Sequence, residues 1–178
     1  LSDTVSETRG VGAARRWVAR EFEAISRECG GCIAVETPSA VITAPPRIPN
    51  PTEVVSVVAV QRGQTDPDRV ILISAHLDSR VSDVMNATDD APGANDDASG
   101  VAALIEAARV LSKERFAATL VYAALTGEEQ GLHGATIVAN WAREQGWDVC
   151  SLNNEGVSNV QGEEGDNETT RIRVCGVG

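Results

Sequence analysis

Hydrophobic residues repeat along this chain with two patterns, one typical of helices and one typical of buried strands. Apolar residues recur every three or four positions over Gly12–Glu28, with charged residues between them, which predicts an amphipathic helix. The same period begins again after Ala98 and over Leu132–Gln145, and it predicts two more helices.

Continuous apolar runs predict the strands. Val54–Val60 and Val70–Ala75 are β-branched and apolar on both faces, as central strands covered on each side are. We expect these two strands to pair as neighbours, because only the turn-forming segment Gln61–Arg69 separates them. Thr119–Leu125 predicts another buried strand. Three further runs predict strands, over Ile33–Ile42, Val149–Leu152 and Thr170–Cys175.

The alternation of strands and helices predicts a single α/β domain over residues 1–178. The 178 residues, 42% of them hydrophobic, suffice for one core. A sheet of this kind is parallel or mixed, lies between helix layers and binds ligands at the carboxyl ends of its strands. The segment Ala44–Pro49 predicts a loop, because proline lacks an amide donor, and the acidic segment 163–168 predicts another.

Charge and composition narrow the range of partners. The net charge of −11 disfavours nucleic acid, whose binding proteins concentrate lysine and arginine on one face. No apolar run approaches the roughly 18–20 residues that cross a bilayer, so we expect no membrane partner. The charged residues 1–28 do not resemble a signal peptide. The chain begins at Leu1 without an initiator methionine, which fits removal of a leader or pro-segment and equally a sequence that is part of a longer one, and we expect a secreted or periplasmic protein.

The four cysteines leave two interpretations open. Cys29 and Cys32 have the spacing of zinc ribbons and redox motifs, but Cys150 and Cys175 stand alone and provide no second pair. The motif also follows a predicted helix instead of opening one. A tight local disulfide, which would suit an exported protein, and two free thiols both remain compatible with this pattern.

Two groups of polar residues follow the predicted strands and could bind metal. His76 and Asp78 end the Val70–Ala75 strand and lie two residues apart, which places them on one face. Asp96 and Asp97 lie in a turn of small residues at the entrance of a predicted helix. Each group also has an ordinary interpretation, a surface histidine in the first case and a helix cap by Asp97 in the second.

Glu128 and Glu129 form a third group, in the loop between a buried strand and the next helix. One carboxylate could bind metal while its neighbour accepts a proton from water, as metal-assisted hydrolysis requires. Two solvated glutamates are the alternative. The strand before them predicts that they reach the same edge of the sheet as His76 and Asp96, so we interpret the three groups as one site.

These motifs resemble the zinc aminopeptidase family of co-catalytic dizinc exopeptidases, whose relatives include glutamate carboxypeptidase and the transferrin-receptor ectodomain. The resemblance rests on Ser74–Ser79, Ala91–Gly100 and Gly127–Leu132, within about a third of the chain. It implies a three-layer α/β/α sandwich with a mixed, mostly parallel central sheet, here incomplete at the C-terminus.

The resemblance also implies a role for each matching residue. His76 would bind one zinc ion, Asp96 would bridge two, and Glu129 would bind the other. Glu128 would be the general base, and Asp78 would orient His76. The implied substrate is a peptide with a free N-terminus, and the implied cofactor is Zn²⁺.

The chain departs from the family pattern at two ligands. Glu155 stands where the family has an aspartate, and we expect it to be a candidate ligand despite its longer side chain. The family's second histidine has no counterpart before Gly178, because His133 matches no family ligand and is expected to be a half-exposed helix residue. We therefore expect one zinc or none in this chain.

Other functions remain compatible with the same motifs. They include a metal-poor fragment or binding domain of the same fold, and carboxypeptidase or single-zinc cyclase chemistry on the same scaffold. The long loop Ser79–Asp90 could bring Arg80 and Met85 to a substrate or could simply be solvated. The pattern does not indicate side-chain specificity or an oligomeric state.

Overall fold

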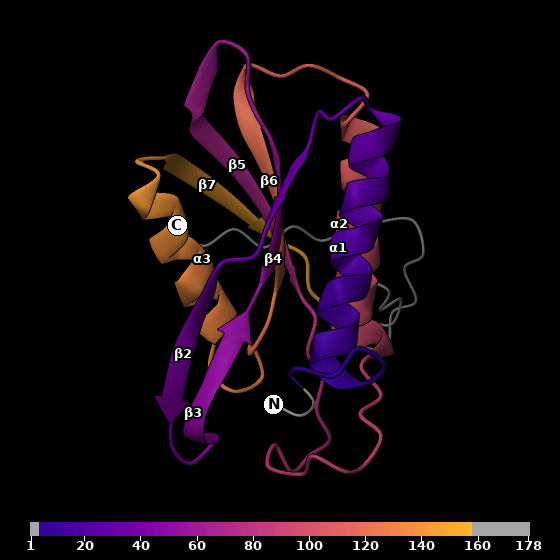
Figure 1. Cartoon of the computed structure of the whole chain (residues 1–178), viewed down its shortest axis with the longest axis vertical. Coiled ribbons are helices and arrows are strands. Elements are labelled where there is room, and N and C mark those ends of the chain that lie inside the picture. The colour runs from indigo at the N-terminus through magenta and orange to yellow at the C-terminus, as the bar shows by residue number, and fades with distance from the viewer. Residues whose placement is uncertain (1–3, 158–178) are drawn as a thin grey trace, which may run out of the picture.

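The computed structural model describes residues 4–157, and its elements alternate as the sequence predicts (Figure 1). The helices within this range are α1 (Gly10–Glu28), the π-helical turn η1 (Ala94–Ala98), α2 (Ser99–Leu111) and α3 (His133–Glu144). The strands are β1 (Ala34–Glu36), β2 (Ser39–Ala44), β3 (Ile48–Val55), β4 (Val57–Gln61), β5 (Asp66–His76), β6 (Ala118–Leu125) and β7 (Asp148–Asn153).

Most predicted elements are confirmed close to their expected bounds. The three predicted helices correspond to α1, α2 and α3, and the runs at Thr119–Leu125 and Val149–Leu152 form β6 and β7. The strand predicted over Thr170–Cys175 and the acidic loop before it lie outside the described residues.

The central sheet has the order β1-β4-β6-β5-β7. Strand β5 pairs in parallel with β6 and β7, whereas β4 pairs antiparallel with β1 and β6. Four of these five strands therefore run in one direction, and the expected mixed sheet is confirmed. The expectation that β4 and β5 are neighbours is wrong, because β6 lies between them. Both strands are buried on two faces, and that apolar pattern does not specify the partner.

Two predicted strands are each divided in the structure. The run Ile33–Ile42 becomes β1 and β2, which belong to different sheets and are interrupted before Ser39. The run Val54–Val60 is broken at Ser56, whose backbone N–H donates to the Pro38 carbonyl. At the first break the chain passes from the central sheet into the β2–β3 hairpin, and at the second it returns to the central sheet. Continuous apolar sequence does not encode either change of direction.

The predicted proline-rich loop over Ala44–Pro49 is only partly correct. Its middle forms the turn between β2 and β3, but Pro49 is already part of β3. This is possible because β3 belongs to a two-stranded sheet, and the prolines lie beside the point where the β2–β3 register shifts.

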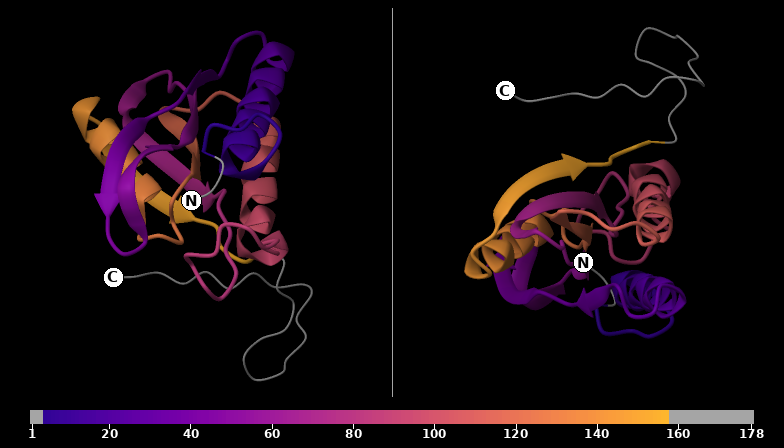
Figure 2. Two further views of the ribbon diagram at one scale, coloured as in Figure 1. Left: turned by 60° about the horizontal axis from the view of Figure 1, so that its bottom comes forward. Right: turned by 90° about the horizontal axis from the view of Figure 1, so that it is seen from above.

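Helices cover both faces of the central sheet, so the predicted three-layer sandwich is confirmed (Figures 1 and 2). On one face, Phe22 of α1 and Leu104 of α2 belong to the same core as Tyr122 of β6. On the other face, Val138 of α3 packs in a second core with Val121. Within residues 4–157, no helix combines the length and hydrophobicity needed to cross a membrane.

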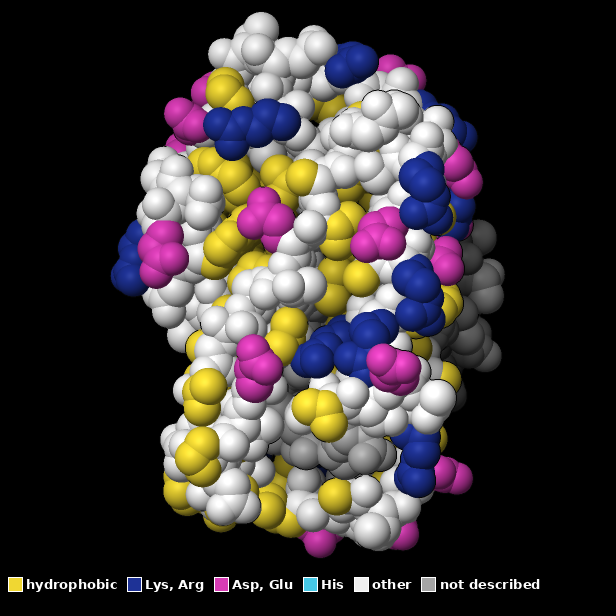
Figure 3. Space-filling view, viewed as in Figure 1, with side chains coloured by type: hydrophobic (Ala, Val, Ile, Leu, Met, Phe, Trp, Pro, Cys, Tyr) yellow, Lys and Arg dark blue, Asp and Glu magenta, His cyan; other side chains and the backbone are white. Residues whose placement is uncertain are grey.

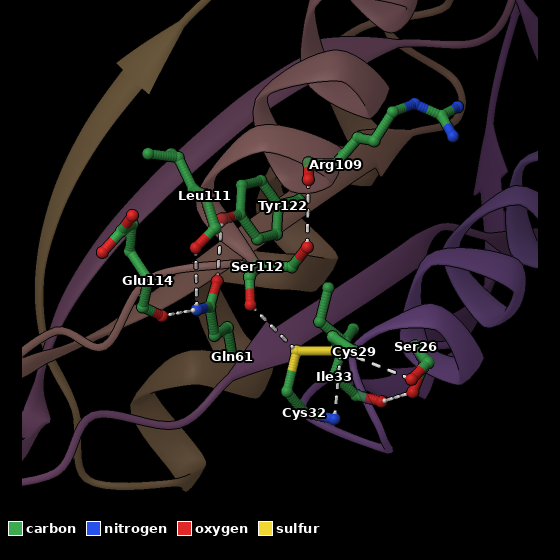
Figure 4. Close-up of a disulfide and its surroundings, with 10 residues drawn as sticks. All are labelled: Ser26, Cys29, Cys32, Ile33, Gln61, Arg109, Leu111, Ser112, Glu114 and Tyr122. Atoms are coloured by element: carbon green, nitrogen blue, oxygen red, sulfur yellow. Dashed lines mark hydrogen bonds between the residues drawn. A yellow bond between two sulfur atoms is a disulfide. The ribbon is translucent and has the colours of Figure 1, made fainter.

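Cys29 and Cys32 form a disulfide, which resolves the alternative that the sequence leaves open. The disulfide links two residues just after α1, and the Cys32 sulfur lies near the carbonyl oxygen of Ser112 at the end of α2 (Figure 4). Ser26 supports the same turn by donating its hydroxyl to the Ile33 carbonyl at 2.6 Å. Cys150, in contrast, is an exposed free thiol.

We expect Phe22→Ala to lower the free energy of unfolding by about 3–5 kcal/mol, because it removes a fully buried ring beside Tyr122. The control is Trp17→Ala on the same helix, whose side chain is 49% exposed and whose loss should cost about 0.5 kcal/mol. Urea unfolding followed by circular dichroism measures both. Equal losses would contradict the packing of α1 on the sheet.

Candidate metal centre

Parallel pairing of β5 and β6 brings the ends of these two strands together. His76, the last residue of β5, lies opposite Leu125, the last residue of β6. The segments that follow the two strands therefore leave the same edge of the sheet, as expected from the sequence. This edge collects the predicted site residues from positions far apart in the chain.

His76 is buried, with 3% of its surface exposed. Its Nδ1 lies 2.8 Å from the backbone carbonyl oxygen of Asp78, so Nδ1–H donates and Nε2 keeps a free lone pair. Nε2 lies 2.9 Å from Oδ1 of Asp96 but makes no aligned hydrogen bond within the described part of the chain. A buried ring nitrogen without a hydrogen bond, facing a carboxylate, is the arrangement that a bound cation would complete.

The pKa of His76 is raised above its ordinary value. Burial alone lowers this pKa, but the Asp78 carboxylate, the hydrogen bond to the Asp78 carbonyl and the carboxylates of Asp97 and Glu128 together raise it more. The imidazole therefore lies in a strongly negative environment, which also favours a metal cation.

Asp78 joins the His76 segment to the glutamate loop. Its buried carboxylate accepts backbone hydrogen bonds from Gly127, Glu128 and Glu129 at 2.8, 3.2 and 3.1 Å. The sequence suggests an Asp78 carboxylate that orients His76, but that carboxylate lies 4.0 Å from Nδ1 and the carbonyl makes the hydrogen bond instead. Asp78 thus positions both the histidine and the loop, through different atoms.

Asp96 and Asp97 have different environments although they are adjacent. Asp97 is 1% exposed and accepts backbone hydrogen bonds from His76, Gly100 and Gly156. A side chain at Gly100 would collide with the Asp97 carboxylate, since an added Cβ would lie 2.4 Å from Oδ1. The Asp96 side chain is 61% exposed and remains available as a ligand.

Burial raises the pKa of Asp97, and its three backbone hydrogen bonds lower the pKa without cancelling the effect of burial. The sequence suggests only a possible helix cap for Asp97, and its bond to the Gly100 amide is of that kind. Asp97 also accepts hydrogen bonds from the backbone amides of His76 and Gly156, and so connects its turn to β5 and to the segment after β7. The sequence does not predict these two contacts.

Glu155 completes a group of three potential metal ligands. One ligand atom from each of His76, Asp96 and Glu155 lies within 4.8 Å of the others. Glu155 is exposed and follows β7, and its carboxylate accepts a hydrogen bond from the Asn153 side chain at 3.0 Å. The longer side chain thus still reaches the position where a ligand is expected.

The Glu128 carboxyl faces this group, whereas the Glu129 carboxylate has another partner. Glu128 lines a cavity of about 230 Å³ together with His76 and Glu155. Burial raises its pKa, the positive charge of His76 lowers it, and neighbouring carboxylates including Glu129 raise it further. Oε2 of Glu129 instead lies 2.6 Å from Nε of Arg80, and Glu129 does not join the group of three within residues 4–157.

His133 does not contribute to the group. It begins α3, is half-buried as expected, and its Nε2 has no hydrogen-bond partner among residues 4–157. Sequence reasoning also missed Gln130, which is buried beside Glu129 and has an unpaired Oε1 within the same range. Its position next to the two candidate glutamates Glu128 and Glu129 is the sequence signal that could have identified it.

The group of three fits a zinc ion in its donor set. One neutral imidazole nitrogen and two carboxylate oxygens are ordinary zinc ligands, and such three-ligand sites leave a position for water or substrate. The unpaired, buried Nε2 of His76 supports the fit, because a metal would supply the partner that this atom lacks in the described structure.

Comparisons with known proteins agree with this geometry. The sequence model of a family described as Peptidase family M28 matches residues 56–162, a range that includes every predicted site residue. The chain is 45% identical over 175 residues to a protein of Pyricularia oryzae described as a probable zinc metalloprotease. That alignment covers 98% of this chain and 35% of the relative, and the chain spans less than half the length of three such curated relatives.

Solved structures that resemble this chain include an aminopeptidase. The chain is similar to the LapA aminopeptidase of Legionella pneumophila, with a TM-score of 0.63 and 28% identity over 85% of this chain and 38% of that one. A glutaminyl cyclase of Fimbriiglobus ruber has a TM-score of 0.65 at 15% identity, over 83% and 54% of the two chains, and shares the fold alone. The resemblance based on the three motifs is confirmed.

We expect Asp78→Asn to lower the free energy of unfolding of the zinc-free chain by about 2–3 kcal/mol, because an amide cannot accept all three backbone hydrogen bonds. Asp68→Asn is the matched control, since Asp68 is 73% exposed and its surface ion pair with Arg62 should contribute less than about 1 kcal/mol. Chemical denaturation measures both. An Asp78 variant as stable as the control would contradict this role.

Proposed function

The chain belongs to peptidase family M28, and on this premise we propose that it is the catalytic part of a zinc-dependent aminopeptidase. The observation that carries the proposal is the convergence of His76, Asp96 and Glu155 within 4.8 Å, beside Glu128. A binding domain would not need a carboxyl of raised pKa facing a set of metal ligands, so the arrangement favours catalysis.

His76, Asp96 and Glu155 would hold a zinc ion, which acts as a Lewis acid on the scissile carbonyl and makes water more acidic. The buried His76 ring would be fixed by its hydrogen bond to the Asp78 carbonyl, so that Nε2 points in one direction. The buried Asp97 would hold the turn that carries Asp96, through its bonds to His76 and Gly100.

Glu128 is the proposed general base. Its raised pKa makes its carboxylate a stronger proton acceptor than an exposed glutamate, so it can remove a proton from the attacking water. The same carboxyl would then deliver that proton to the amine that leaves. The Glu128 backbone N–H is bonded to Asp78, which keeps the base at the edge of the sheet during both steps.

A second zinc ion, for which Asp96 and Glu129 would be ligands if the family pattern held, is not part of the proposal for these residues. The Glu129 side chain is 12% exposed and paired with Arg80, so this position would require Glu129 to share or exchange that partner. The described residues offer one group of three ligands, and the family's second histidine has no counterpart in the chain. We therefore propose a single tightly held zinc ion.

The proposed substrate is a peptide with a free N-terminus, whose positive charge suits a site with so many carboxylates. We propose no nucleic-acid or membrane partner. A secreted or periplasmic location is also proposed, and the Cys29–Cys32 disulfide supports it because such bonds persist in oxidising compartments.

We expect the 178-residue chain to bind about one zinc ion, and His76→Ala to abolish this binding, because Nε2 supplies the nitrogen ligand. Titration calorimetry and metal analysis after dialysis measure affinity and stoichiometry. His133→Ala should bind zinc as the parent does. Two tightly bound ions per chain would contradict the proposal and would require another source of ligands.

In the natural protein, we expect Glu128→Gln to reduce kcat by at least about 100-fold while zinc affinity changes little, because the amide cannot accept a proton. Release of amino acids from a peptide with a free N-terminus measures the activity. The same peptide with an acetylated N-terminus should not be cleaved. Equal cleavage of both peptides would rule out an aminopeptidase, and full activity of the variant would rule out Glu128 as the base.

A further inference from the structure

A larger cavity, of about 580 Å³, lies next to the proposed catalytic residues. Its walls come from four parts of the chain: the first turns of α1, the β2–β3 turn, the loop after β5, and Gln130. Asp78 and Arg80 both line it and both contact Glu129, so the cavity adjoins the loop that carries the proposed base.

Two arginines from distant parts of the chain meet at this wall. Arg47 donates from Nη1 to the Glu129 carbonyl at 3.0 Å, and Arg80 donates from Nε to the Glu129 carboxylate at 2.6 Å. Although the net charge is −11, the face in Figure 3 also carries arginine side chains along α1. A guanidinium has five N–H donors, so each arginine retains donors for a further anion.

The acidic residues that line the cavity do not cancel these charges. Asp78 directs its carboxylate to three backbone amides. Asp89 accepts a hydrogen bond from Asn86 within its own loop, and both Asp89 and Asp90 are exposed at the rim. Arg80 is already paired with the Glu129 carboxylate, and its Nη1 donates to two loop carbonyls, which leaves Nη2 for a ligand. Among the described residues Arg47 hydrogen-bonds to the Glu129 carbonyl, so its positive charge is the less compensated of the two at this wall.

Gln130 adds an unpaired acceptor to the same wall. It is only 6% exposed, and its buried Oε1 has no hydrogen-bond partner within the part of the chain that the structure describes. A buried amide oxygen without a partner is unfavourable because it has lost its water, so this position favours a ligand that brings an N–H donor. The N–H of a peptide bond is such a donor. In a peptide with an acidic side chain or a free C-terminus, this N–H lies close to a carboxylate.

We propose that this cavity binds a carboxylate of the peptide substrate, either an acidic side chain or the free C-terminus. Arg47 and Arg80 hold the carboxylate by charge-assisted hydrogen bonds, and Gln130 accepts a hydrogen bond from a neighbouring peptide N–H. The inference rests on the proposed function in one respect, since it takes the ligand to be a peptide. It assigns a substrate preference to residues outside the metal ligands.

The test measures peptide binding to the chain after zinc is removed with a chelator, by titration calorimetry at physiological salt. The three probes all have a free N-terminus: a tripeptide amide without a carboxylate, here called the neutral amide because its side chains and C-terminus are uncharged, the same tripeptide with a free C-terminus, and a tripeptide amide with glutamate at its second position. We expect one or both carboxylate peptides to bind at least about tenfold more tightly than the neutral amide. The glutamate peptide and the free C-terminus separate the two sources of the carboxylate.

Arg47→Gln should reduce the preference for the carboxylate peptide to within about twofold, because it removes a donor without changing the Glu129 side chain's ion pair. Arg62→Gln is the matched control, since Arg62 is exposed and does not line this cavity. The fold of each variant is checked by circular dichroism. Equal binding of neutral and carboxylate peptides, or an unchanged preference in Arg47→Gln, would overturn the proposal.

The two proposals fail separately. Carboxylate preference in this chain, together with no peptide cleavage by the natural protein, would retain this cavity and refute the aminopeptidase. Cleavage of neutral and acidic peptides alike, with no difference in their binding, would retain the aminopeptidase and refute the cavity. Arg80→Gln is measured last, because loss of its ion pair could also move Glu129.

Discussion

The candidate site depends on one buried carboxylate. Asp78 follows β5, yet it accepts three consecutive backbone N–H groups from the loop that follows β6. Ionised oxygen accepts such bonds more strongly than a neutral oxygen does, and burial keeps water from competing for them. His76 and Glu128 can face each other because this residue fixes the distance between the two segments.

A high density of negative charge is the second feature of the site. The structure stabilises these carboxylates in different ways: Asp78 and Asp97 with backbone amides, and Glu129 with Arg80. Asp96 and Glu155, in contrast, are exposed and face a histidine nitrogen that lacks a hydrogen bond. The carboxylates of Asp96 and Glu155 are thus the ones that lack strong partners in the protein, and they meet where a cation would bind. A bound cation would compensate their charges, which are costly to leave unpaired.

Local pattern predicted the helices and the family well, because helix periodicity and the motifs around His76, Asp96 and Glu128 lie within short segments. It did not predict that β6 separates β4 from β5, since strands apolar on both faces fit several positions in a sheet. The environment of Asp97 and the Arg80–Glu129 pair could not be predicted either. Both depend on contacts between segments 21 to 59 residues apart in the chain.

Strand β7 has a consequence for the chain as a metal-binding protein. It pairs with β5 alone among the described strands, all six of its residues are exposed, and Glu155 follows it directly. A strand whose residues are this exposed opens at lower free energy than the buried strand β6. Any fraying of β7 would carry one carboxylate away from the other two ligands. Ion occupancy and hydrogen exchange of the β7 amides are therefore thermodynamically coupled, and an ion that binds would slow that exchange.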